Sequence, residues 1–168
     1  EWAVVSLPSL VVLLTYPYIM GAIKRLQVNH SSYGSTPLAI SATIGQFYRL
    51  YIVAFAIALV GLFVLILTIA TMAFIPIIGW VAIPFVYLFF GALYMGYLRS
   101  RVTNLTFSST TLGGRVQFIS SMMPMSLAKI YFINLIVISF TLGLMIPWAA
   151  VRVARYRASV LVLESSGD

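Results

Sequence analysis

The chain has 168 residues, of which 62% are hydrophobic and only 8% are charged, and its mean hydropathy is +1.07. A soluble domain carries about a quarter charged residues and covers its surface with polar groups. The composition therefore excludes an ordinary soluble domain and predicts an integral membrane protein, in which lipid solvates the apolar surface.

The charged residues are unequal in sign and uneven along the chain. Ten Lys and Arg stand against three acids, which are Glu1, Glu164 and Asp168. A net charge of +7 can indicate nucleic-acid binding. The basic residues here flank apolar runs, however, so we expect them to anchor helix ends at the membrane and expect no nucleic-acid partner.

Four apolar segments reach the length of roughly 20 residues that a membrane-spanning helix needs. They cover residues 2–23, 51–75, 79–98 and 130–151, and none contains a charged side chain. The first has no basic residues before it, which favours a true span over a signal peptide. Because the chain begins with Glu1 and not Met, we expect it to be a fragment or a processed piece.

The connections between these segments carry their own patterns. Residues 76–80 contain Pro and Gly and predict a tight turn between the second and third segments. Residues 26–41 and 102–120 each predict strand, turn and strand, and residues 158–163 predict one further strand. A lone hairpin is marginally stable in water, so we expect the two hairpins to pair into a small sheet at one membrane face.

The predicted fold is an α-helical integral membrane protein with a bundle of four apolar segments and small β-hairpins at one membrane face. Residues 1–168 form a single membrane domain in this interpretation. Segments of similar pattern predict an internal repeat, with units at approximately 16–75 and 90–151 and a partial third unit at 147–164.

The orientation depends on the fourth segment. With four full spans, seven basic residues share one side, whereas Arg152, Arg155 and Arg157 lie on the other. This favours hairpin loops in the cytoplasm. Alternatively, Thr141–Leu144 and Pro147 break the segment in the membrane and turn it back, which places all ten basic residues on one side. The simple span is the leading interpretation, and the re-entrant hairpin remains open.

Residues 141–156, with the sequence TLGLMIPWAAVRVARY, resemble a repeated element of the YjgN-like family of bacterial inner-membrane proteins. Residues 16–18 followed by Arg25, and residues 47–51, resemble the middle unit of that family. The middle copy has Tyr18 and Ala22 where the last copy has Trp148 and Arg152, and the N-terminal unit is not found. The resemblance implies a multi-pass protein of the bacterial inner (cytoplasmic) membrane. It implies no activity, because the family is of unknown function.

Residues for catalysis or metal binding are scarce. His30 is the single histidine, there is no cysteine, and no carboxylate occurs from residue 2 to residue 163. Catalysis needs positioned acids, bases or nucleophiles, and metal sites need several His, Cys or carboxylate ligands. We therefore expect no enzyme, no metal and no cofactor, and interpret His30 as a loop or surface residue.

Two sets of side chains are candidate sites. Arg152 and Arg155 share one helix face near Trp148 and Tyr156; they anchor the membrane edge or hold an anion or a lipid phosphate. The second set bonds between helices or lines a polar pathway, and consists of Asn134, Ser139 and Thr141.

The sequence thus favours a non-enzymatic structural module that binds membrane lipids, including anionic ones, or a protein partner or a second copy of itself. Ala54, Ala58 and Gly61 give the second segment a small-residue face that allows close packing or oligomerisation. The alternative is a channel-like or transporter-like half molecule that passes a neutral or anionic solute.

Overall fold

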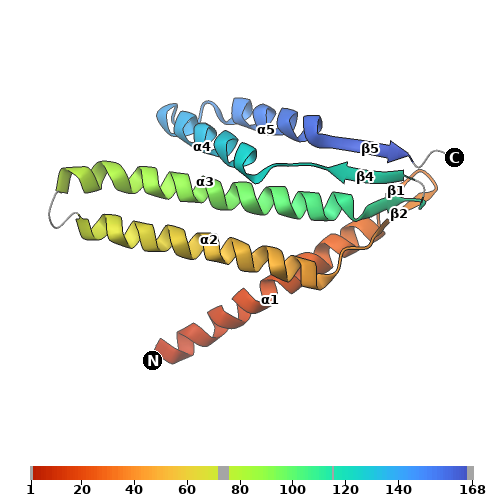
Figure 1. The fold of residues 1–168 in the computed structure, drawn as a ribbon, viewed down its shortest axis with the longest axis horizontal. Helices are drawn as coiled ribbons and strands as arrows, with labels where there is room; N and C mark the ends of the chain where they lie inside the picture. Colours follow the sequence, from red (N-terminus) through yellow and green to blue (C-terminus); the bar gives the residue numbers. More distant parts are fainter. Residues whose placement is uncertain (1, 72–75, 115, 166–168) are drawn as a thin grey trace. The chain divides into compact units, whose positions relative to one another are not determined.

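The computed structural model describes residues 2–71, 76–114 and 116–165, and Figure 1 shows their elements in chain order. These residues form a mainly helical fold with one small antiparallel sheet. The elements are α1 (Trp2–Asn29), β1 (Ser32–Tyr33), β2 (Thr36–Ile40), α2 (Ile44–Thr71), α3 (Pro76–Ser108), β3 (Thr110–Leu112), β4 (Val116–Ser120), α4 (Pro124–Phe140), α5 (Ile146–Val160) and β5 (Leu161–Ser165).

Two stretches of the described residues are long and apolar enough to cross a membrane. They are Ile44–Thr71 and Ala82–Ser108, with hydropathies of 3.1 and 1.3. Large apolar side chains are exposed along α2, including Ile52 and Phe63. A helix that is apolar all round is suited to lipid and not to water. The structure therefore supports membrane helices at the second and third predicted segments, whereas a four-helix membrane bundle is not established.

Several helices extend further than the sequence pattern predicts. Helix α1 continues to Asn29, α3 to Ser108 and α5 to Val160, so strands predicted at 26–29, 102–107 and 158–160 are wrong. Adding a residue to an existing helix gains a hydrogen bond without a new nucleation step. This gain outweighs the weak and context-dependent strand preference of β-branched and aromatic residues.

The turn predicted at residues 76–80 is also wrong, because α3 already begins at Pro76. Proline is favoured at the first position of a helix, where its missing N–H would have no intrahelical partner. The connection between α2 and α3 is formed by residues 72–75, which lie outside the described residues.

The five strands form one sheet in the order β1-β2-β3-β4-β5. Strand β2 pairs antiparallel with β3, with Leu38 opposite Leu112 and Ile40 opposite Thr110. The prediction that the two hairpins join into a small sheet is therefore confirmed. Both hairpin turns use glycine at positive φ, which is 63° at Gly34 and 57° at Gly113, a conformation that glycine adopts without steric cost.

The chain divides into two compact units. We call Glu1–Tyr51, Val102–Ser120 and Val162–Asp168 the sheet unit, and Ile52–Arg101 and Ser121–Leu161 the helical unit. The core of the sheet unit is formed by Ile40, Ala42 and Phe47, against which Val28 and Leu105 pack.

Two asparagines tie helix ends to the hairpins within the sheet unit. The Oδ1 atom of Asn29, at the end of α1, accepts a hydrogen bond of 3.2 Å from the backbone N–H of Ile40. The Oδ1 atom of Asn104, near the end of α3, accepts a bond of 2.6 Å from the Ser120 hydroxyl. Each asparagine thus joins the last turns of a helix to the last residue of the hairpin that follows it.

The fourth apolar segment is not one continuous helix, so the leading interpretation of a single helix over 130–151 is wrong. Helix α4 ends at Phe140, the chain reverses, and α5 begins at Ile146 and lies beside α4 (Figure 1). The N–H of Gly143 donates to the Ile138 carbonyl at 2.9 Å, and that of Leu142 to the Ser139 carbonyl at 3.4 Å. This is a Schellman closure of a helix end, with φ of 48° at Leu142 and 91° at Gly143.

The closest glycine contact gives a test of packing inside the helical unit. A Cβ at Gly96 of α3 would lie 2.6 Å from the backbone nitrogen of Ala128 in α4, whereas a Cβ at Gly91 would meet nothing within 4 Å. We expect Gly96→Ala to lower the free energy of unfolding in detergent by about 1–3 kcal/mol, as overpacking does. Gly91→Ala, the matched control, should be neutral or stabilising because alanine favours helix. Equal stability of the two variants would contradict this contact.

Candidate functional site

The predicted anion site has a cluster of polar and aromatic side chains at its centre, between α4 and α5 in the helical unit. The guanidinium carbon of Arg152 lies 5.3 Å from the centroid of the Trp148 ring. An Nη1 N–H of Arg152 donates to Oδ1 of Asn134 at 3.5 Å, and Nδ2 of Asn134 donates to the Ala149 carbonyl at 3.3 Å. Asn134 is only 4% exposed, so this cluster is a polar link between α4 and α5 at a buried position.

The electrostatics of Arg152 are unusual because no carboxylate occurs between residues 2 and 163. The indole face supplies a cation–π attraction, and the amide of Asn134 accepts one hydrogen bond. Neither partner neutralises the positive charge. A guanidinium has five N–H donors in a planar fork that matches phosphate and carboxylate groups, so Arg152 keeps donors and charge for an external anion.

The other two predicted anion-site residues are Tyr156 and Arg155. The Tyr156 hydroxyl accepts a hydrogen bond of 3.0 Å from the Met123 N–H and donates one of 3.4 Å to the Met123 carbonyl. Tyr156 therefore fixes the open end of the α4–α5 hairpin. Arg155 is exposed on α5. The structure thus brings Arg152 and Trp148 together, while Tyr156 is engaged by the backbone.

The predicted polar pathway is not assembled as a set. Asn134 bonds to the Arg152 cluster. The Thr141 hydroxyl donates to the Val137 carbonyl at 2.7 Å and accepts from the Met145 N–H at 3.4 Å. Ser139 is exposed. Bonding within and between helices therefore accounts for Asn134 and Thr141, and the link from Asn134 to Arg152 was not expected from the sequence.

His30 follows the end of α1 and lies outside the strands, so the strand predicted around it is wrong, whereas its interpretation as a loop or surface residue is confirmed. It is exposed, and its Nδ1 atom lies 2.9 Å from the Leu26 carbonyl one turn earlier. Among the residues that the structure describes, no group of three or more His, Cys, Asp or Glu side chains lies close enough to hold a metal ion.

A second polar feature, a cavity in the sheet unit, was missed by the sequence reasoning. It has a volume of about 240 Å³ and is lined in part by Lys24, Gln27 and Thr106. In the sequence, Lys24 was interpreted only as a membrane anchor, and Thr106 as part of a predicted strand. Nothing in their spacing indicates that α1 and α3 bring them together.

These features define a mainly helical protein with two helices suited to a membrane, a small sheet and an arginine–tryptophan cluster. The model of a family described as a bacterial protein of unknown function (DUF898) matches residues 2–168, and the chain belongs to this family. It is the family that the YjgN-like resemblance indicated. Comparisons with curated proteins and with solved structures found no match.

The bridging role of Asn134 can be tested by removing its amide. We expect Asn134→Leu to lower the free energy of unfolding in detergent by about 1 kcal/mol, the usual size of such interhelical bonds. Ser139→Ala, on the same helix but exposed, should change stability by less than about 0.5 kcal/mol. A loss for Ser139→Ala as large as that for Asn134→Leu would show that the bridge is not what holds the hairpin.

Proposed function

We propose that this chain is a non-enzymatic, multi-pass module of the bacterial inner membrane that holds a small sheet and the basic helix ends beside it at the cytoplasmic headgroups and binds anionic lipid. The observation that carries this proposal is the position of the positive charges along the helices. Every described basic residue lies in the half of its helix that is joined to the sheet, except Arg152, which stands at the middle of α5.

The connectivity makes this charge pattern plain. Helices α1 and α3 end at strands, α2 and α4 begin after strands, and α5 runs directly into β5. The stretches 2–23, 50–98 and 130–151, which contain the opposite helix ends, have no charged residue. By the positive-inside rule this pattern favours a sheet in the cytoplasm. The described basic residues are Lys24, Arg25, Arg49, Arg99, Arg101, Lys129, Arg152, Arg155 and Arg157.

Helices α1, α2 and α3 are the proposed spans, and the α4–α5 hairpin enters the membrane and returns to the same face. Helices of 17 and 15 residues rise roughly 25 and 22 Å, less than the hydrocarbon thickness of about 30 Å. The hairpin leads from β4 and returns to the neighbouring strand β5. At its tip, Phe140, Leu142 and Leu144 are 84%, 95% and 81% exposed. Such a tip is unfavourable in water and suited to lipid.

Corresponding contacts support the proposed internal repeat. A helix, two strands and a helix follow one another from α1 to α2 and again from α3 to α4. In the first set Gly21 faces Phe47 at the start of the next helix, and in the second Gly96 faces Ala128. The two asparagine-to-hairpin bonds also occupy corresponding places.

The structural role is favoured over the transport role because the polar side chains of the fourth segment are hydrogen-bonded inside the protein. The side chains of Asn134 and Thr141 are hydrogen-bonded within the hairpin, whereas a solute pathway needs polar groups that face it. Gly61 of the small-residue face packs against Phe90, which assigns that part of the face to packing within the chain. Lipid is therefore the partner that we propose.

Because the chain has no cysteine, single cysteines test the topology directly with a membrane-impermeant maleimide. We expect Tyr33→Cys in β1 and Glu164→Cys in β5 to react only in inverted vesicles, and Thr71→Cys at the far end of α2 to react only in spheroplasts. Leu142→Cys should react only after detergent is added. Labelling of Glu164→Cys in spheroplasts would show that the last hairpin crosses the membrane.

Lipid binding at the arginine cluster is tested by native mass spectrometry from mild detergent. We expect the wild-type chain to retain anionic lipid. The double variant Arg152→Gln/Arg155→Gln should reduce the retained fraction about tenfold, since a hydrogen bond to a charged group contributes about 1.5–3 kcal/mol. The control Lys129→Gln removes one exposed charge from α4 and should retain lipid. Equal lipid retention by all three proteins would show that Arg152 and Arg155 do not bind the lipid.

A further inference from the structure

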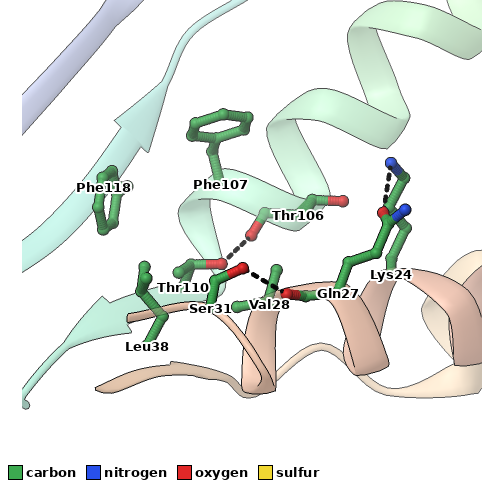
Figure 2. A pocket seen from close by; sticks show the side chains of 9 residues that line it. All are labelled: Lys24, Gln27, Val28, Ser31, Leu38, Thr106, Phe107, Thr110 and Phe118. Carbon is green, nitrogen blue, oxygen red and sulfur yellow. Dashed lines mark hydrogen bonds between the residues drawn. The ribbon is translucent and has the colours of Figure 1, made fainter. Parts of the chain in front are cut away.

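The cavity of about 240 Å³ in the sheet unit lies between the ends of α1 and α3 and three strands of the sheet, β2, β3 and β4. Figure 2 shows Lys24 and Gln27 of α1 on one side of Thr106, and the ring of Phe118 on the other. Its lining residues are Lys24, Gln27, Val28, Ser31, Leu38, Thr106, Phe107, Thr110 and Phe118.

Some polar groups of this cavity are already committed to the backbone. The Ser31 hydroxyl donates to the Gln27 carbonyl at 2.6 Å, and the Thr110 hydroxyl donates to the Thr106 carbonyl at 2.6 Å. Both bonds close the last turn of a helix. These two hydroxyl protons are therefore not available to a ligand.

The remaining polar groups are all donors or can act as donors. Lys24 Nζ lies 3.2 Å from Oε1 of Gln27; because an ammonium only donates, the carbonyl end of the Gln27 amide faces Lys24 and its NH₂ group is left to point elsewhere. Lys24 has two further N–H donors. With no carboxylate between residues 2 and 163, its charge has no acidic partner in this part of the chain.

Thr106 supplies the second, independent observation. It is only 9% exposed, and its Oγ1 atom is buried without a hydrogen-bond partner. In Figure 2 this hydroxyl points to the side on which Lys24 and Gln27 lie. A buried polar group without a partner costs free energy, and an acceptor bound in the cavity would remove that cost.

The other wall of the cavity is apolar. The rings of Phe107 and Phe118 meet edge to face with centroids 6.2 Å apart, and Val28 and Leu38 line the cavity beside them. The volume lies below the range of about 300–1,000 Å³ that holds drug-sized ligands. The space therefore suits a headgroup with its first carbon atoms and not a whole lipid.

We propose that this cavity binds a phosphate group, with the charge of Lys24, the amide NH₂ of Gln27 and the hydroxyl of Thr106 as its donors. The phosphate belongs to a lipid headgroup or to a free phosphate ion. The lipid source rests on the proposed function, because it needs Lys24 at headgroup depth. The existence of a phosphate site does not rest on the proposed function, because the cavity is distinct from the Arg152 cluster and all its residues belong to the sheet unit.

The test is a titration of the full chain in neutral detergent with dihexanoyl phosphatidic acid in one arm and inorganic phosphate in the other, read by intrinsic fluorescence and by the shift of the Tm. We expect Lys24→Gln and Thr106→Val each to weaken binding about tenfold or more, as the loss of a hydrogen bond to a charged group does. Arg25→Gln, which removes the same charge from the neighbouring residue outside the cavity lining, should bind like the wild type.

The Tm without ligand separates binding from folding. Thr106→Val should not lower it, because the lost hydroxyl has no partner and valine keeps the volume. Binding in the lipid arm alone assigns the site to a headgroup, and binding in both arms assigns it to phosphate in general. Absence of binding in both arms, or equal affinity of Lys24→Gln, Thr106→Val and Arg25→Gln, overturns the site. The outcome of this titration is independent of the cysteine-labelling and lipid-retention experiments, so the cavity site can fail while the proposed function holds, and the reverse.

Discussion

The solvent requirement of apolar helices is the constraint on which the rest of this structure depends. Helix α2 exposes large apolar side chains along its length, and no arrangement in water solvates them at low cost. Within lipid every backbone amide must be bonded inside its own segment, which an α-helix achieves. The non-helical backbone is confined mainly to the hairpins and the sheet, next to the helix ends that carry the basic residues.

The lack of acidic residues shapes how positive charges are held. Arg152 is placed against an indole face and a single amide, and Lys24 against another amide. Amide and aromatic partners hold the side chains in place without cancelling their charge. The protein therefore presents positioned but uncompensated cations, which is the arrangement that attracts an anionic surface or headgroup.

The long-range features of the fold were more predictable than its local boundaries. Membrane-length helices at the second and third segments and the joined hairpins followed from hydropathy and from the polar, Gly-containing connections. The ends of α1 and α3 did not, because strand-forming residues such as Val102 continue a helix that has already nucleated. The break at Leu142 was visible only as an alternative, indicated by Gly143 and Pro147, since a leucine at φ of 48° gives no sequence signal itself.

The candidate sites were also predictable only in part: a contact within one helix was expected, whereas contacts between elements were not. The sequence placed Trp148 near the helix face that Arg152 and Arg155 share, and the contact of Trp148 with Arg152 is seen. The link from Arg152 to Asn134 depends on the chain reversing between them, and the cavity at Thr106 depends on β2 pairing with β3 across an intervening helical hairpin. Contacts of this kind follow from tertiary structure, which residue spacing along a single chain does not encode.

The strand order has a consequence for how the protein is made. Because the strands are neighbours in the order of synthesis, the sheet grows by addition at one edge and no strand has to be inserted between two others. The edge of β2 that pairs with β3 stays open until α2 and α3, which stand between the two strands in the chain, have been made. Pairing of β3 along that edge therefore comes only after both helices of membrane length have been made.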